Sequence, residues 1–366
     1  MSKKILTEEQ KYKRGSRIRV LLIVLIILAI GGVGFVSAKT FLHQAEKKIE
    51  EKLSNFDYVA LDDKKLDIDE DVNAQLVDYR NILLLGIDAR EGEDVEKCRS
   101  DAMVVVTINK KTNDVMLTSI LRDSFLDLEE GGYHTIDKLT HAHVYGGPVN
   151  TIRAINRNLD LNINDFVRVN WRTVADLADA FGGITVNIKD YEIDEMNKYI
   201  KDTNRNLHGS KKEITRAGKQ KLNGIQTVTY CRIRKVGNGD VERSLRMRRV
   251  VKQLLKKAVK MDLKELSDTA DKVLPQIQTS IDPKDMMTLL KRYKSYKIKK
   301  SRSWPYKYSG LLLNNGSGQD LWYDVPMTLE SNVIKLHSKL FGQKNYEPTD
   351  RVMEIHNQIM TMVNSR

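Results

Sequence analysis

The chain has 366 residues, of which 41% are hydrophobic and 30% charged, and its net charge at pH 7 is +12. This composition is typical of a folded protein with one large domain or two small ones. The basic balance favours an anionic partner, such as nucleic acid, a membrane surface or a phosphorylated glycan. The only two cysteines, Cys98 and Cys231, exclude a disulfide-dense scaffold and a cysteine-rich zinc site.

An uncharged apolar run at residues 20–38 follows a basic segment at residues 1–19. A membrane-spanning helix needs about 17–25 apolar residues, whereas secretory h-regions usually have only about 7–15. We therefore predict an uncleaved transmembrane signal anchor rather than a cleaved signal peptide. Cationic flanks stay in the cytoplasm, so the protein is expected at the cell membrane with a single span, a cytoplasmic N-terminus and an extracellular domain. This topology argues against a nucleic-acid partner.

Residues 39–78 are charged and poor in aromatic residues. We predict an extracellular stalk, in which the Asp-rich stretch 62–71 is extended and lacks the glycine and terminal glutamate of an EF-hand calcium loop. Strands alternate with helices over residues 79–366 and no linker divides them. This pattern predicts one folded domain of the α/β class.

The predicted elements of this domain begin with an apolar run at residues 81–86, typical of a strand buried on both faces. A hairpin, a long loop and a helix opened by Pro148 follow. In chain order, the ranges are strands 102–109 and 115–120, loop 124–147, helix 148–159, strand 166–170, helix 171–181, strand 184–188, an irregular insertion at 191–212, helix 240–261, strand 291–300 and a terminal helix at 350–363.

Residues 226–250 predict a strand, a Gly-Asn-Gly turn and a helix. Arg232 and Arg234 are two apart on the predicted strand and share a face. Arg243 and Arg246 are three apart at the predicted helix start and also share a face. Guanidiniums bind phosphate or carboxylate in bidentate fashion, so the spacing fits a pyrophosphate site. It fits a solvated basic surface equally well.

Polar side chains follow the ends of the predicted strands, where ligands bind in open α/β sheets. The set comprises Asp88, Arg90, Arg99, Asp101, Arg122, Asp123, Lys138, Arg232, Arg234, Asp240, Arg243 and Arg246. Arginines with a minority of aspartates are typical of a phosphate site with one divalent cation, because magnesium prefers one or two carboxylates plus phosphate oxygens. The alternative is a set of surface salt bridges, each contributing about 0–1 kcal/mol. Two histidines, His141 and His143, predict packing or hydrogen bonding rather than zinc binding.

Seven stretches in order resemble the LytR–CpsA–Psr family of cell-wall phosphotransferases, across roughly residues 79–261. They are residues 81–90 (NILLLGIDAR), 99–103 (RSDAM), 119–123 (SILRD), 138–139 with 145–147, 181–184 (FGGI), 222–224 (LNG) and 230–249. The resemblance implies a three-layer α/β/α sandwich with a mixed central sheet. It also implies transfer of an anionic glycan, such as teichoic acid or capsular polysaccharide, from a polyprenyl-pyrophosphate carrier to peptidoglycan through a phosphodiester, with release of polyprenyl phosphate.

The resemblance implies Mg²⁺ as cofactor, held by Asp88 and Asp101. The implied catalytic residues are Asp88, Asp101, Arg122 and Asp123, and the implied pyrophosphate ligands are Arg99, Arg122, Arg232, Arg234, Arg243 and Arg246. Asp123 would orient a neighbouring arginine, and Lys138 matches a basic family position. Two other functions stay open: a binding module that holds polyprenyl-linked glycans without turnover, and a pyrophosphatase that releases the glycan to water.

Departures from the family pattern lie at Leu121, Thr140, His141, His143 and Met247, none of which is an implied magnesium or pyrophosphate ligand, so we expect an active enzyme. Each cysteine directly precedes an implied pyrophosphate ligand. If Arg99 and Arg232 reach one pyrophosphate, Cys98 and Cys231 are close and a disulfide between them is possible outside the cell. Two buried, unpaired thiols are the alternative.

Overall fold

The computed structural model describes residues 58–89, 92–210, 212–258, 260–261, 277–292, 295–299, 301–314 and 318–365. The expected cytoplasmic tail, the expected anchor at 20–38 and the first part of the expected stalk lie outside these ranges. Within them, no helix is both long and apolar enough to cross a membrane. The chain divides into unit 1 (residues 1–60, 169–236 and 249–298) and unit 2 (residues 61–168, 237–248 and 299–366).

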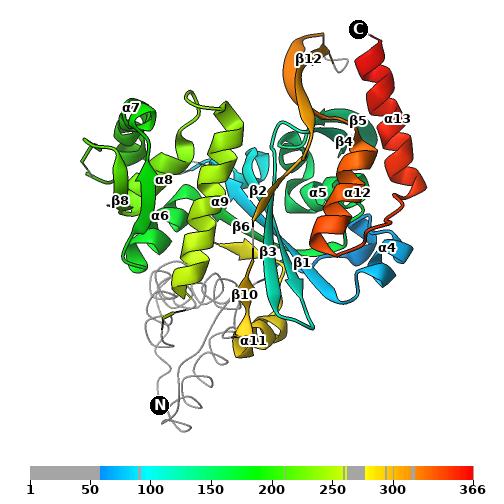
Figure 1. The fold of residues 1–366 in the computed structure, drawn as a ribbon, viewed down its shortest axis with the longest axis horizontal. Helices are drawn as coiled ribbons and strands as arrows, with labels where there is room; N and C mark the ends of the chain where they lie inside the picture. Colours follow the sequence, from blue (N-terminus) through cyan, green and yellow to red (C-terminus); the bar gives the residue numbers. More distant parts are fainter. Residues whose placement is uncertain are drawn as a thin grey trace, which may run out of the picture. The chain divides into compact units, whose positions relative to one another are not determined.

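A mixed sheet with flanking helices forms the framework of unit 2 (Figure 1). Its strands include β1 (Tyr79–Ile87), β2 (Ser100–Asn109), β3 (Asp114–Ile120), β6 (Ile163–Asn170) and β11 (Arg302–Trp304). β2 is antiparallel to both β1 and β3, β6 lies beside β1, and β11 pairs with β3 in parallel. The strands predicted from apolar runs are confirmed, as are the α/β class and the mixed sheet.

Unit 2 includes the helices α5 (His141–Leu159), α12 (Leu329–Leu340) and α13 (Asp350–Asn364), and two hairpins accompany them. One hairpin joins β4 (Phe125–Glu130) to β5 (Tyr133–Lys138), and the other joins β12 (Tyr308–Asn314) to β13 (Asp320–Pro326). The loop prediction for residues 124–147 is therefore wrong. Gly131 and Gly132 both have positive φ, which the tight turn between β4 and β5 requires.

Helix α5 is kinked rather than continuous. Gly146 and Gly147 have non-helical backbone angles, and Gly147 has a φ of 62° that favours glycine. Pro148 then begins the second helical part, as predicted, because proline lacks the N–H that a first-turn residue leaves unpaired. The first part of α5, from His141, falls in the segment that was expected to be a loop.

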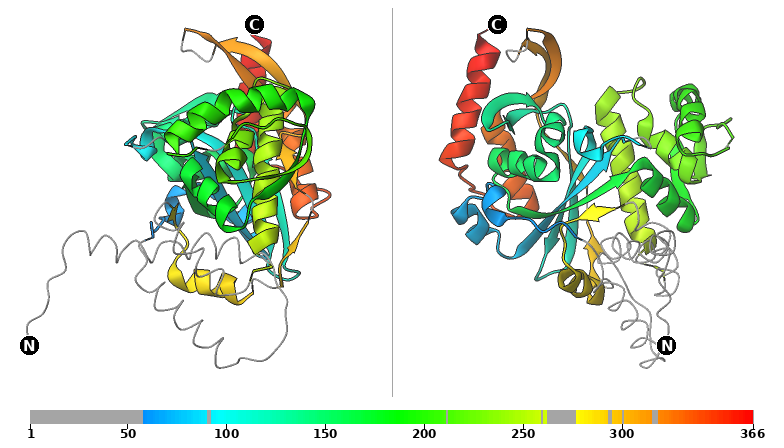
Figure 2. Two further views of the ribbon diagram at one scale, coloured as in Figure 1. Left: turned by 90° about the vertical axis from the view of Figure 1, so that its left-hand side faces the viewer. Right: turned by 180° about the vertical axis from the view of Figure 1, so that it is seen from behind.

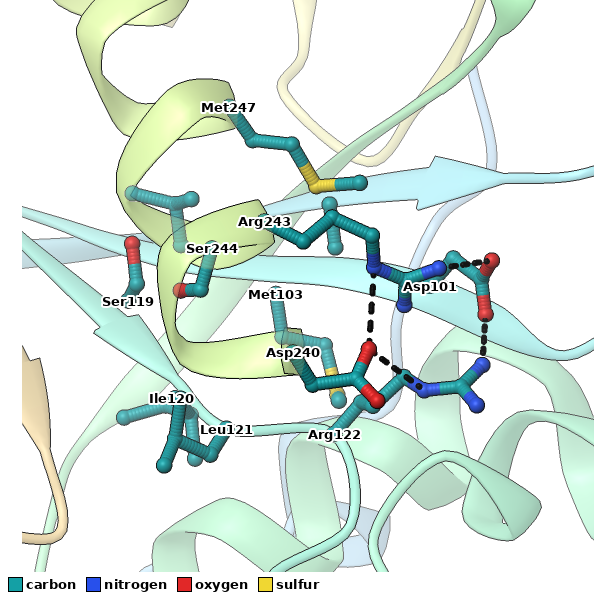
Figure 3. Close-up of a pocket in the computed structure, with 12 residues that line it drawn as sticks. Asp101, Met103, Ser119, Ile120, Leu121, Arg122, Asp240, Arg243, Ser244 and Met247 are labelled. Carbon is teal, nitrogen blue, oxygen red and sulfur yellow. Dashed lines mark hydrogen bonds and ion pairs between the residues drawn. The ribbon is translucent and has the colours of Figure 1, made fainter. Parts of the chain in front are cut away.

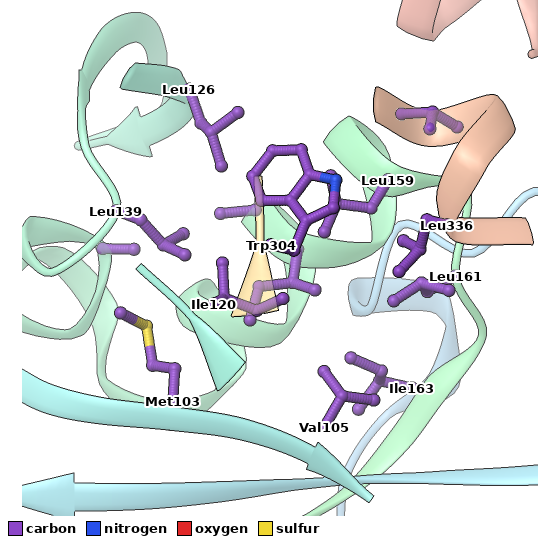
Figure 4. Packing of buried hydrophobic residues seen from close by; sticks show 14 of the residues in the cluster. Met103, Val105, Ile120, Leu126, Leu139, Leu159, Leu161, Ile163, Trp304 and Leu336 are labelled. Carbon is purple, nitrogen blue, oxygen red and sulfur yellow. The ribbon is translucent and has the colours of Figure 1, made fainter. Parts of the chain in front are cut away.

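Alternate residues of β1, β2 and β3 build the hydrophobic core of unit 2, for example Leu83, Leu85, Met103 and Val105. Figure 4 shows the fully buried Trp304 of β11 surrounded by side chains such as Leu126, Leu159 and Leu336. The core therefore fixes the strands whose ends carry the polar residues of the candidate site.

Residues 61–78 pack on this core through one set of apolar side chains and do not form a stalk, so that part of the prediction is wrong. Leu66, Val72 and Leu76 are buried within the core cluster. The segment contains a short 3₁₀ turn, η1 (Asp63–Lys65), and the helix α4 (Glu70–Gln75), whose N-cap is Asp69. Asp62 and Asp69 cap these turns and Asp67 pairs with two arginines, which explains why an Asp-rich stretch can be folded.

The burial of Leu66 makes the fold of this segment testable. Leu66→Ala should lower the free energy of unfolding by about 2–5 kcal/mol, because it removes buried methyl groups and leaves a cavity. Val77→Ala is the matched control, since Val77 is 64% exposed and its loss should change stability by no more than about 0.5 kcal/mol. Urea denaturation of the full-length protein measures both; equal effects would contradict the packing.

Unit 1 contains α6 (Trp171–Ala180), β7 (Ile184–Ile188), α7 (Asp190–Asn206), β8 (Gly218–Leu222), α8 (Gly224–Arg232), β9 (Gln278–Thr279), α11 (Pro283–Lys291) and β10 (Lys297–Ile298). β7 and β8 are antiparallel, and α8 packs against α6 and α7 (Figure 2, green segments). The helix α9 (Gly239–Ala258) begins in unit 2 and ends in unit 1. Of residues 291–300, predicted as a strand, Lys291 ends α11 and residues 297–298 form the two-residue strand β10.

Two further predictions in unit 1 are wrong. Residues 191–212, expected to be irregular, lie largely in α7, which buries Met196 and Ile200 on one face. The β-branched stretch at 226–232 is the helix α8 rather than a strand. Asn223 and Gln226 cap this helix reciprocally, and Thr229 Oγ1 donates a hydrogen bond of 2.7 Å to the Ile225 carbonyl oxygen. These local bonds outweigh the strand propensity of the sequence.

Candidate functional site

A cleft in unit 2 lies where β2 begins, β3 ends and α9 begins (Figure 3). It encloses about 320 Å³ of empty space, with its open mouth included. Apolar side chains such as Met103, Ile120 and Met247 line one part, and the polar part is formed by Asp101, Arg122, Asp240 and Arg243. The cleft thus combines an apolar wall with charged groups.

A β-bulge places Asp101 at this cleft. Gly86 pairs with Ala102 and Ile87 pairs with Ser100, so Asp101 is the extra residue of β2. Such bulges redirect side chains and are frequent beside active sites. Gly86 permits the close approach of the strands, because a Cβ atom there would lie 2.9 Å from the Cβ of Ala102. Asp88 follows Ile87 and therefore lies at the same edge of the sheet as Asp101.

Two aspartates and two arginines of the cleft form a closed ring of ion pairs, which we call the charge ring (Figure 3). Asp101 accepts hydrogen bonds from Arg122 through Oδ1 and from Arg243 through Oδ2, the latter at 3.1 Å. Asp240 Oδ1 lies 3.1 Å from Arg243 Nε and 3.6 Å from Arg122 Nε. Each arginine thus bridges both carboxylates.

The members of the charge ring stabilise one another's ionised forms. Burial alone would raise the pKa of Asp101, but Arg243 and Arg122 outweigh it and the pKa is lowered. Burial would lower the pKa of Arg122, but Asp101, Asp123 and Asp240 raise it. Asp101 and Arg122 are therefore ionised at neutral pH, and the formal charges of the two aspartates and two arginines cancel within the ring.

Three more charged residues, Asp123, Lys138 and Asp324, adjoin the charge ring. Asp123 lies 3.5 Å from Arg122 Nε and 3.8 Å from Lys138 Nζ. The Asp324 backbone N–H donates to the Asp123 carbonyl oxygen at 2.8 Å. Burial, followed by repulsion from Asp123 and Asp240, raises the pKa of Asp324 to about 6. Asp324 therefore takes up a proton at only slightly acidic pH.

The raised pKa of Asp324 predicts a pH-dependent stability. The pKa of the Asp324 carboxyl is about 6 in the folded state and near 3.8 in the unfolded state, so the folded state binds this proton more tightly. The contribution of Asp324 to the free energy of unfolding therefore falls as pH rises from about 4 to 6. Asp324→Asn should raise the free energy of unfolding by on the order of 1–3 kcal/mol at pH 8, with no gain below about pH 4. Urea denaturation at several pH values measures this, and the exposed Asp320→Asn on the same strand is the control. A pH-independent difference would contradict the assignment.

The histidines predicted to pack or hydrogen-bond do so. His141 Nδ1 lies 2.6 Å from Asp137 Oδ2, and Tyr323 donates to the other oxygen of this carboxylate at 3.2 Å. Burial lowers the pKa of His143 to about 4, so its neutral ring donates from Nδ1 to the Cys98 carbonyl oxygen. In the part of the chain that the structure describes, no group of three potential His, Cys, Asp or Glu ligands is placed to hold a metal ion.

The structure brings together Asp101, Arg122, Asp123 and Arg243 of the predicted site residues. Arg246 shares the helix with Arg243, but it is fully buried and bonds to Glu242 at 2.8 Å. The side chains of Asp88 and Arg99 are exposed at the edge of the sheet. Asp240 completes the charge ring and was not assigned a role; its position three residues before Arg243 in a helical first turn is the signal that could have identified it.

The argument that placed Arg232 and Arg234 on one face of a strand is wrong, because Arg232 is the last residue of helix α8. Within unit 1, Arg232 donates to Asp202 at 2.7 Å and to Thr203 at 3.0 Å, and Arg234 is exposed. Their role as pyrophosphate ligands stays a prediction.

Cys98 and Cys231 are not bonded to each other in the structure, and a disulfide between them outside the cell stays a prediction. Cys98 Sγ contacts the Asp94 carbonyl oxygen at 3.4 Å within its own loop. Cys231 is buried in the last turn of α8.

The residues at the edge of the sheet fit a magnesium ion. Asp88 and Asp101 extend from neighbouring strands at one end, and two carboxylates are a donor set that magnesium accepts together with phosphate oxygens and water. Both oxygens of Asp101 bond to arginines in the structure, so a cation there would compete with these arginines.

Comparison with known proteins gives the relationship of the chain. The model of the LytR_cpsA_psr family matches residues 38–325, which is most of the sequence. The chain belongs to this family. The resemblance inferred from the seven sequence stretches is therefore confirmed.

Two relatives from Bacillus subtilis (strain 168) are named polyisoprenyl-teichoic acid–peptidoglycan teichoic acid transferases. TagT is 28% identical over 285 residues, which cover 77% of this chain and 82% of TagT. TagU is 27% identical over 290 residues, which cover 78% of this chain and 85% of TagU. A solved structure of TagT bound to LI-WTA is 25% identical, with a TM-score of 0.54, and the match covers 74% of this chain and 93% of that one.

Proposed function

We propose that this family member transfers an anionic glycan from a polyprenyl-pyrophosphate carrier to peptidoglycan through a phosphodiester and releases polyprenyl phosphate. The charge ring is the observation that carries the proposal, because it sets two guanidiniums beside an apolar wall in one cleft. The names of TagT and TagU, which describe transfer of a polyisoprenyl-linked teichoic acid to peptidoglycan, support the choice of donor and acceptor.

Arg122 and Arg243 would bind the pyrophosphate in this reaction. Guanidiniums grip phosphate oxygens in bidentate fashion and stabilise the charge that develops on the departing phosphate. Asp240 contacts both arginines and Asp123 contacts Arg122, so these two carboxylates would keep the guanidiniums aimed at the cleft. Arg99, Arg232 and Arg234 are proposed as further pyrophosphate ligands on the family match alone.

Magnesium dependence belongs to the same proposal. Asp88 and Asp101 would hold Mg²⁺, and the bound ion would neutralise charge on the pyrophosphate oxygens. If Asp101 bound the ion, Arg122 and Arg243 would each lose one carboxylate partner and would be available to the phosphate groups. The proposed anchor at residues 20–38 would hold the protein on the outer face of the cell membrane, where the lipid carrier presents its glycan.

A transfer assay tests the function. The full-length protein in detergent, given Mg²⁺, a polyprenyl-pyrophosphate-linked glycan and peptidoglycan, should attach glycan to peptidoglycan and release an equal amount of polyprenyl phosphate. EDTA should stop both, and added Mg²⁺ should restore them. The proposal fails if no carrier-linked glycan tested gives polyprenyl phosphate. Release that proceeds equally without peptidoglycan would instead identify a pyrophosphatase.

The charge ring predicts a specific loss on mutation. Asp101→Asn removes one of the two negative charges and a proposed magnesium ligand, so transfer should fall at least about 100-fold while binding of the lipid-linked donor persists. The matched control is Asp114→Asn, because Asp114 pairs with Lys299 at 3.2 Å, outside the cleft. Transfer rates and donor binding are measured on the same preparations. Unchanged transfer by the Asp101 variant would remove Asp101 from the site.

A further inference from the structure

The outer face of the β12–β13 hairpin carries an exposed tryptophan whose role the proposed reaction leaves open. Tyr323 and Val325 of β13 point into the core of unit 2, so Trp322 and Asp324 point to the other face. Leu312 lies directly opposite Trp322, and Gly310 lies opposite Asp324. Trp322 is 54% exposed and Leu312 is 58% exposed. This face thus exposes an aromatic ring and an aliphatic side chain, whereas the Asp324 carboxylate on it is buried.

Trp322 is held in one orientation although it is exposed. Its six-membered ring covers Gly310, where an added Cβ would lie 2.0 Å from the ring carbon Cζ2. Asp324 lies on the same face of β13, two residues along the strand. The absence of a side chain at Gly310 therefore makes room for the ring, which lies against the backbone there. An aromatic side chain held in this way offers a rigid surface at low entropic cost.

Strand β13 connects Trp322 to the surroundings of the charge ring within unit 2. Asp324, two residues after Trp322, donates its backbone N–H to the Asp123 carbonyl oxygen at 2.8 Å. Asp123 in turn lies 3.5 Å from Arg122. A ligand that covers the indole therefore lies next to the groups that would bind the pyrophosphate.

The chemistry of this face selects a carbohydrate. The C–H groups of a pyranose ring pack on an indole, and its hydroxyls donate to carboxylates such as the exposed Asp320. A lipid surface is disfavoured, because tryptophans that enter a membrane interface are accompanied by cations, whereas Asp320 and Asp324 flank Trp322 on this face. Two exposed apolar side chains are also too few for a stable protein interface, which buries roughly 800 Å² on each partner.

We propose that Trp322 forms an acceptor subsite, on which a pyranose of the peptidoglycan glycan strand stacks so that its hydroxyl faces the charge ring. The inference rests on the proposed function for the identity of the acceptor. It adds a binding residue that the pyrophosphate site does not include.

Binding and transfer together test the subsite. The probe is a set of soluble, uncrosslinked peptidoglycan glycan chains, titrated against the full-length protein in detergent and followed by tryptophan fluorescence and calorimetry. Trp322→Ala should weaken glycan binding and raise the acceptor KM about tenfold, with the KM for the lipid-linked donor unchanged. Trp322→Phe should recover part of the affinity and lose the fluorescence change. Tyr133→Ala is the matched control, because Tyr133 is an aromatic residue 81% exposed on the other hairpin of unit 2.

The outcomes separate this inference from the proposed function. If the wild-type protein and Trp322→Ala transfer glycan with the same acceptor KM, the subsite is wrong and the transferase function stands. A wild-type protein that binds glycan chains through Trp322 but transfers nothing would support the subsite and refute the transferase. Trp322-dependent binding to phosphatidylglycerol vesicles, without glycan binding, would overturn the subsite in favour of a lipid contact.

Discussion

The ion pairs of Asp101 with Arg122 and Arg243 are the constraint on which the site depends. They join three segments that are distant in the sequence, since Asp101 and Arg243 are 142 residues apart. Each of these side chains is largely withdrawn from water, and a buried charge is tolerated only when it is paired. The start of α9 therefore has to lie against the ends of β2 and β3. The charge pairing and the packing of the hydrophobic core both favour this arrangement, which forms the cleft.

Backbone features of the sheet and of α5 position these charged side chains. The bulge at Asp101 requires the close approach that Gly86 permits. Thr140, just before α5, donates from its backbone N–H to the Arg122 carbonyl oxygen and from its hydroxyl to the Ser100 carbonyl oxygen. The N-terminal end of α5 is therefore fixed to both strands that carry the ring, which links the core to the chemistry of the site.

Short-range patterns in the sequence predicted the elements that short-range interactions determine. The apolar run of β1 and the β2–β3 hairpin have periodicities that a short window reveals, and the family motifs located Asp101, Arg122, Asp123 and Arg243. Helix α8 escaped prediction because its β-branched residues resemble a strand, and its capping box overrides them. The burial of Leu66 and its neighbours was not predicted, because a segment rich in aspartates resembles a solvated segment even when the aspartates cap turns. The partnership of Asp240 with both arginines depends on tertiary contacts that no short window contains.

The charge ring is already neutral within itself, and this affects which anions can enter. An incoming phosphate does not meet bare cations, because each guanidinium is engaged by carboxylates that the phosphate must displace. The net gain in binding free energy is the difference between the hydrogen bonds that the phosphate makes and those that it displaces. This gain is small for an anion that replaces only one carboxylate. Two linked phosphates can satisfy both guanidiniums at once. If the charge ring binds the pyrophosphate as proposed, its resting ion pairs would favour two linked phosphates over a monophosphate, by exchange of partners rather than by size.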